Sequence, residues 1–204
     1  MLRRAILAVL LCATLGAGEV YDRIAVTVGN RVITESAVIL DLRVSAFLDR
    51  VLVNLGPEKK REAAERLVDQ MLILRDATES HLTLPTAQNV GSLLEQLKAQ
   101  FGSPQEYEAA LRQYRIQERD ITAQLVSGLV ALTFTDLRFR PGIQVTEDEL
   151  RAYYDTIQDA STFEAAREEI ENLIARQRET DALDKWLAEA RANERIEFRE
   201  QVFR

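Results

Sequence analysis

The chain has almost none of the residue types that enzymes use for nucleophilic, thiol or metal chemistry. Cys12 and His81 are the only cysteine and histidine among its 204 residues. Any Ser-His-Asp triad would depend on His81, and neither a G-x-S-x-G nucleophile motif nor a glycine-rich phosphate loop occurs. A Cys/His zinc site cannot be assembled from one residue of each type. The sequence therefore predicts no catalytic, metal-binding or cofactor-binding residue, and it favours binding over catalysis.

Basic residues are also in deficit, with 26 Lys and Arg against 33 Asp and Glu. A net negative chain is a poor ligand for nucleic acids or anionic membranes, because both require clustered Lys and Arg. The acidic runs 147–149 and 168–169 suit the first turns or solvated faces of helices better than paired catalytic carboxylates. The charge pattern predicts neither nucleic-acid binding nor acid–base catalysis.

The first 18 residues have the layout of a cleaved secretion signal. A pair of arginines is followed by Ala5–Leu15, which is uncharged and mostly apolar, and then by three small residues. The apolar run is too short to span a bilayer, which requires about 20 residues. We therefore predict a signal peptide over residues 1–18, cleaved between Gly18 and Glu19.

Two other fates of this segment stay open, lipidation at Cys12 and retention as a membrane anchor. Lipidation is disfavoured because Leu11 precedes Cys12, where a small residue is expected. A cut after Ala17 is disfavoured because it would place Leu15 at the outer specificity position. Cleavage at Gly18 leaves 186 residues without cysteine, so the mature chain must depend on its apolar core.

The segment Asp22–Val38, DRIAVTVGNRVITESAV, predicts a short β-hairpin leading into a capped helix. Alternation in its first strand places three apolar side chains on one face, Ile24, Val26 and Val28. Gly29-Asn30 is a turn pair able to adopt positive φ. Thr34 predicts the N-cap of the helix. A lone hairpin is only marginally stable, so the segment requires a further partner.

Apolar residues at helical spacing predict helices over most of the remaining chain, with Gly, Pro and Ser/Thr signals at their ends. The expected helices are Glu35–Leu55, Pro57–Ser80, Thr86–Phe101, Pro104–Tyr114, Gln117–Phe139, one from Glu147 and a long one from Ser161. The helix Gln117–Phe139 has an apolar face wider than a stripe, which predicts burial between neighbours. Arg140–Gln144 is the one expected hinge.

Residues Arg195–Phe203, RIEFREQVF, alternate again and predict a terminal strand. We expect this strand to pair with the hairpin, because isolated strands at both ends would have no other stabilisation. The expected fold is therefore mainly α, a multi-helix module with a small antiparallel β element formed by the N-terminal hairpin and the C-terminal strand. Pairing with the hairpin of a second molecule would instead give a swapped homodimer.

Few single residues indicate a binding site. His81 lies beside leucines and is expected to be a surface or packed residue with no catalytic role. Most aromatic residues are expected in the core, although some could line an apolar groove. The residues considered are Tyr107, Tyr114, Phe134, Phe139, Tyr153, Tyr154, Phe163 and Trp186.

The order of these segments resembles that of the SurA-like periplasmic chaperones and related PpiC/parvulin-type foldases. The resemblance lies in the signal peptide, the hairpin, a helix pair, SPQEYEAALRQYRIQERDITAQLVSGLVALTFTDL and VTEDELRAYYD. The last helix and strand, residues 164–198, are similar to the family's C-terminal segment, which completes the N-terminal core. The resemblance implies one chaperone domain over 19–204, with an N-terminal part 19–157 and a completing part 161–204.

One departure from the family changes what the resemblance implies. Larger members carry parvulin isomerase domains between the VTEDELRAYY helix and the C-terminal helix. Only five residues, 158–162, separate the corresponding segments here, and about 50 residues is a lower bound for a domain. We therefore expect no isomerase activity, and we do not expect the protein to be an enzyme.

The resemblance implies an ATP-independent periplasmic chaperone that binds unfolded exported proteins, in particular outer-membrane proteins, through an apolar helical groove. It implies no cofactor, no nucleic acid and no stable membrane insertion after cleavage. Two alternatives stay open, a foldase related to peptidyl-prolyl isomerases and an adaptor that binds one folded partner. The peptide-binding residues cannot be identified from the sequence.

Overall fold

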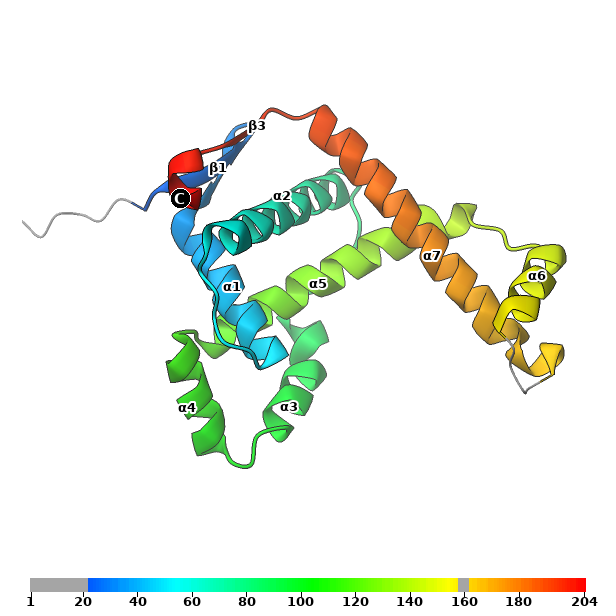
Figure 1. The fold of residues 1–204 in the computed structure, drawn as a ribbon, viewed down its shortest axis with the longest axis horizontal. Helices are drawn as coiled ribbons and strands as arrows, with labels where there is room; N and C mark the ends of the chain where they lie inside the picture. The colour runs from blue at the N-terminus through cyan, green and yellow to red at the C-terminus, as the bar shows by residue number, and fades with distance from the viewer. Residues whose placement is uncertain (1–21, 158–161) are drawn as a thin grey trace, which may run out of the picture.

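The computed structural model describes residues 22–157 and 162–204. These ranges contain seven α-helices, three β-strands and three short 3-10 helices (Figure 1). The prediction of a mainly helical fold with a small antiparallel sheet is confirmed. The predicted signal peptide and its cleavage residues, Gly18 and Glu19, lie outside the described residues.

The sheet joins the two ends of the described chain. Strands β1 (Ile24–Val28) and β2 (Arg31–Thr34) form the predicted hairpin, and β3 (Ile196–Phe198) pairs with the other edge of β1. Both pairings are antiparallel, and the strand order is β2-β1-β3. The expected pairing of the C-terminal strand with the hairpin is therefore confirmed within one molecule.

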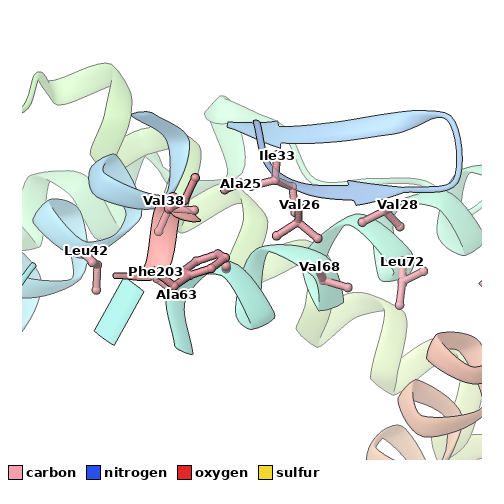
Figure 2. Close-up of a cluster of buried hydrophobic side chains, with 12 residues drawn as sticks. Ala25, Val26, Val28, Ile33, Val38, Leu42, Ala63, Val68, Leu72 and Phe203 are labelled. Carbon is pink, nitrogen blue, oxygen red and sulfur yellow. The ribbon is translucent and has the colours of Figure 1, made fainter. Parts of the chain in front are cut away.

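The prediction that side chains along β1 alternate strictly between a buried and an exposed face was wrong. Ala25 is fully buried, while Ile24 is 42% exposed. The pairing of β1 with β2 shifts register between Ile24 and Val26, as in a β-bulge, which breaks the two-residue period at this point. The prediction holds for Val26 and Val28, which are buried against the helices (Figure 2).

The C-terminal strand is also shorter than predicted. Only Ile196–Phe198 is strand, and residues Glu200–Phe203 form the 3-10 helix η3. The Arg199 amide donates to the carbonyl oxygen of Ala25 at 2.8 Å, which ends the strand pairing. The chain then turns so that Val202 and Phe203 enter the core beside the sheet, because their burial outweighs further strand pairing.

Helix α1 (Glu35–Asp49) begins at the predicted cap, since the Thr34 side chain accepts a hydrogen bond from the Ala37 amide. It ends six residues before the predicted Leu55. Arg50 adopts a left-handed conformation with φ 56°, and its amide donates back to carbonyl oxygens of the last turn. The Leu52 side chain, predicted on the helix, is 86% exposed in the following loop.

The other predicted helices are present with small shifts at their ends. They are α2 (Pro57–Glu79), α3 (Gly91–Ala99) after the 3-10 helix η1 (Ala87–Val90), α4 (Pro104–Tyr114), α5 (Glu118–Phe139) before η2 (Arg140–Gly142), α6 (Glu147–Ile157) and α7 (Phe163–Ala192). Ser103 caps α4, and Thr146 with Glu149 forms the predicted capping box of α6. Ser161, predicted to start the last helix, lies outside the described residues, and Thr162 is the N-cap of α7.

Four apolar clusters hold the helices together. The first lies under the sheet and joins β1, α1, α2 and η3, as Figure 2 shows for Val38, Val68 and Phe203. The second joins α1 with α3, α4 and the start of α5. The third joins α2, the end of α5 and α7 around Phe134 and Trp186, whose ring centroids lie 4.9 Å apart. The fourth joins α6 only to the first half of α7, and this pair projects from the rest of the fold (Figure 1).

Ion pairs fix the C-terminal segment onto α2. Arg191 of α7 makes a two-point contact with Asp69, at 2.7 and 2.8 Å. Arg75 pairs with Glu194, just before β3. Arg61 lies over the Phe198 ring, 3.8 Å from its centroid. Helix α2 is therefore held by the sheet and α7 as well as by α1 and α5, and the part of its surface beside α5 that stays uncovered forms one side of a groove.

Candidate peptide-binding groove

A groove of about 420 Å³ runs between α2 and α5. We call it the α2–α5 groove. Its volume lies at the lower end of the range of about 300–1,000 Å³ for small-ligand sites, so it has room for only a few side chains. Its lining consists of Arg31 from β2, Leu67, Gln70, Met71, Ile73 and Leu74 from α2, and Ala123, Val126, Ser127, Val130 and Ala131 from α5.

The wide apolar face of α5 explains why the groove exists. Val130 and Phe134 are buried against Ile73 and Ala77 of α2, which holds the two helices together. Val126 and Ala131 flank this contact and are only partly buried. The prediction that α5 is buried between neighbours was therefore wrong for part of its face. Its apolar surface exceeds what α2 and α7 cover, and part of the remainder lines the groove.

Helix α2 contributes an exposed apolar surface to the same groove. Leu74 is 43% exposed, and Leu67 and Met71 are partly buried. Met71 is flexible and polarizable, so its side chain can adapt to occupants of different shape. The floor of the groove can therefore accept apolar side chains without a fixed fit.

The polar groups of the groove are few and not engaged elsewhere. The side chains of Gln70 and Ser127 make no hydrogen bond within residues 22–157 and 162–204, so both can serve the backbone of an occupant. No Asp or Glu lines the groove, although the chain carries 33 of them. Arg31 is the single charged residue of the lining, and it has no ion pair within the part of the chain that the structure describes.

The aromatic residues do not line this groove, a role that the sequence left open for some of them. Phe134 and Trp186 pack together in the third cluster, and Tyr114 packs edge-on against Phe47 in the second. Tyr154 packs edge-on against Phe163 in the fourth cluster. The aromatic side chains therefore stabilise the contacts between helices, and the groove is lined by aliphatic side chains and Met71.

A second pocket, about 690 Å³ in volume, lies between α3 and α4 and has a charged mouth. The Lys98 ammonium lies 3.1 Å from Glu95 and 3.0 Å from Glu118, so its charge is already neutralised. The Tyr107 hydroxyl is buried without a hydrogen bond to any described residue, and burial together with Glu118 raises its pKa to about 12. This pocket is larger but offers less continuous apolar surface than the α2–α5 groove.

The remaining sequence predictions concern residues away from both pockets. His81 is exposed after the end of α2, with φ 54°, and lines neither pocket. Within the described ranges, no three His, Cys, Asp or Glu side chains are placed to hold a metal ion. None of the helices formed by these residues combines the length and the apolar character needed to cross a membrane.

Comparison of the sequence with models of known protein families and with curated proteins gives no match.

Proposed function

We propose that this protein is an ATP-independent chaperone that binds unfolded exported proteins, with outer-membrane proteins as its main clients and the periplasm as its location. The observation that supports this proposal most is the α2–α5 groove, an apolar surface left uncovered in the fold and free of acidic side chains. Unfolded chains expose short apolar stretches, which such a groove can bury. No cofactor or covalent step is required.

The chemistry of the groove suits many clients. Apolar burial is non-directional and scales with the area removed from water, so client side chains need only be apolar and small enough to enter. Met71 and the exposed Leu74 allow the floor to repack around different side chains. Gln70 and Ser127 can hydrogen-bond to the client backbone, whose groups are the same in every sequence.

The expected affinity is weak because the groove is small. Burying one Leu or Val side chain contributes about 1.5–3 kcal/mol, and association costs about 4 kcal/mol or more in lost freedom. A few side chains therefore give a Kd of about micromolar or weaker. Weak binding still reduces aggregation, since it lowers the concentration of free unfolded chains by mass action.

The test is dilution of a urea-unfolded outer-membrane β-barrel protein into buffer with or without the purified protein, followed by light scattering. We expect the protein to suppress aggregation. Leu74→Glu should weaken client binding about tenfold, because it places a charge on the groove floor. Leu132→Glu is the matched control, since Leu132 lies on α5 outside the groove and is 68% exposed.

Three results would contradict the proposal. The first is absence of both aggregation suppression and a detectable complex. The second is one stoichiometric folded partner in pull-downs without binding of unfolded clients, which would favour an adaptor. The third is catalysis in a proline-limited peptide assay that survives Leu74→Glu, which would revive the isomerase alternative.

A further inference from the structure

We propose that the α2–α5 groove takes the carboxyl-terminal end of an apolar polypeptide, with Arg31 binding the terminal carboxylate. This inference rests on the proposed function and specifies which part of a client enters the groove. The supporting observations are the position of Arg31 at the groove, the absence of other charge in its lining and the small volume of the site.

The backbone of Arg31 is held at a fixed point beside the groove. Arg31 is the first residue of β2 and is in register with Val28 of β1. The preceding turn contains Gly29, which has φ 57°, and its amide donates to the Arg195 carbonyl at 2.9 Å. The turn is thus fixed by the N-terminal hairpin and by the C-terminal segment together. A guanidinium carried from such a turn has a limited range of positions over the groove.

Arg31 also differs from the cations of α2 itself, because all of those are engaged in ion pairs. Helix α2 and the segments packed on it contain five arginines whose carboxylate partners lie within the fold: Arg61, Arg66, Arg75, Arg138 and Arg191. Arg31 has no such partner among residues 22–157 and 162–204. Its five N–H donors are therefore open to a carboxylate from outside, which guanidinium can bind with two parallel hydrogen bonds.

The apolar lining favours a chain end over an internal acidic residue as the source of that carboxylate. A segment that buries all its side chains in an apolar groove carries no Asp or Glu, so its only carboxylate is at the C-terminus. A chain end extends out of the groove in one direction only, whereas an internal segment has to extend out of it in two. A chain end therefore suits a groove of only about 420 Å³. The last apolar side chains would lie on Leu67, Met71 and Leu74, and the terminal carboxylate would reach Arg31.

The experiment uses fluorescence anisotropy with an N-terminally labelled octapeptide that ends in three aliphatic residues, made as the free acid and as the amide. We expect the native protein to bind the acid about fivefold more tightly than the amide, the range of a partly exposed Arg–carboxylate pair. Arg31→Gln should remove this difference, so that the acid and the amide bind with equal affinity. Arg112→Gln is the matched control, because Arg112 lies on α4 with 71% of its side chain exposed.

Further measurements test the role of Arg31 separately from the proposed chaperone function. Screening predicts that the preference for the acid disappears at about 1 M salt, where the Debye length is about 3 Å. Equal binding of acid and amide would overturn the role of Arg31 and leave the chaperone proposal standing. An amidated peptide with an internal Asp that binds as tightly as the free acid would overturn the terminal assignment. Dodecanoate that binds more tightly than any peptide would assign the groove to fatty acids.

Binding of neither peptide, together with no suppression of aggregation, would overturn the proposed function itself. Leu74→Glu provides the internal check, since a charge on the groove floor should weaken binding of both the acid and the amide. Thermal unfolding of Arg31→Gln should match that of the native protein, because Arg31 is exposed and its ladder contacts are made by the backbone.

Discussion

The ion pair between Asp41 of α1 and Arg66 of α2 joins two residues of very different exposure. The Asp41 side chain is 2% exposed and the Arg66 side chain 45% exposed, with 2.6 Å between Oδ2 and Nη2. The second carboxylate oxygen, Oδ1, is buried without a hydrogen bond to any described residue. Burial raises the pKa of Asp41 above its ordinary value of 3.8, and Arg66 offsets part of the rise. Among the described residues, Arg66 is thus the only cation paired with the buried carboxylate of Asp41.

We predict that removing Arg66 and removing Asp41 have unequal effects. Arg66→Met should destabilise the protein by about 3 kcal/mol at pH 7, because an unpaired buried charge costs about 3–5 kcal/mol. The loss has an upper limit, because the folded protein can protonate the unpaired carboxyl instead of burying its charge. At pH 7 this protonation costs about 1.4 kcal/mol for each pH unit above the ordinary pKa of 3.8, or about 4 kcal/mol in all. Asp41→Asn removes the charge, and its effect should stay within about 1 kcal/mol. The double variant should be about as stable as Asp41→Asn alone.

The pH dependence gives a second measure of the same effect. Because the pKa of Asp41 is raised on folding, the folded state holds this proton more firmly than the unfolded state. Its contribution to the free energy of unfolding therefore decreases as the pH rises through the folded pKa and recovers as the pH falls. Without Arg66 the pKa rises further, so the loss caused by Arg66→Met should shrink as the pH is lowered toward about 4.

Urea unfolding of the native protein, both single variants and the double variant, followed by circular dichroism at several pH values, measures all four free energies. The slopes with urea should agree among the variants, which shows that the same transition is compared. A loss below about 1 kcal/mol for Arg66→Met at pH 7, or a loss independent of pH, would refute the reasoning, since a buried carboxylate would then need no partner.

Three further predictions concern the core, the hairpin turn and the leader. Phe134→Ala should cost about 3–5 kcal/mol in urea unfolding because the side chain is fully buried, whereas Leu132→Ala, at an exposed site, should stay within about 0.5 kcal/mol. Gly29→Ala should lower the melting temperature, because φ is +57° and the new Cβ would lie 2.7 Å from Glu194 Oε1; an unchanged melting temperature would show that the turn can relax. Intact mass spectrometry of the exported protein should show loss of residues 1–18, and retention of the full mass would support the membrane-anchor alternative.

Local signals in the sequence were sufficient for most elements. The Gly29-Asn30 turn, the Thr34 cap and the Ser103-Pro104 helix start all depend on residues a few positions apart, and all were predicted correctly. The pairing of the C-terminal strand with the hairpin was predicted by a different argument. The sequence offered neither the hairpin nor the terminal strand any other pairing partner, and isolated strands are unstable. The α-helices and strands could therefore be predicted before their arrangement, whereas the three 3-10 helices were not predicted.

The errors arose where distant contacts decide the structure. The early end of α1 depends on Arg50, whose left-handed conformation is rare for a residue other than glycine. Hydrogen bonds from Arg50 to Gln100 and from Tyr114 to the Val51 carbonyl hold the following loop, and neither contact can be read from α1 itself. The end of β3 depends in the same way on the burial of residues 202–203 under the sheet.

An apolar groove among the helices was expected from the resemblance, but the sequence did not indicate where such a groove would lie. The sequence showed that α5 has more apolar surface than one contact requires, and this surface was interpreted as buried. Which part stays uncovered depends on how α2 and α7 cross α5, and no local pattern gives that arrangement. Arg31 had no sequence signal at all, because its position at the groove follows only from the packing of the hairpin on α2.

The pairing of β3 with β1 has a consequence for when the protein can become folded. About 170 residues separate these strands, so the second edge of β1 stays open until residues 195–204 have been made. Until then the first cluster also lacks Val202 and Phe203. Residues 195–204 therefore complete both the sheet and the first cluster, and the N-terminal hairpin stays incompletely packed through most of the synthesis of the chain.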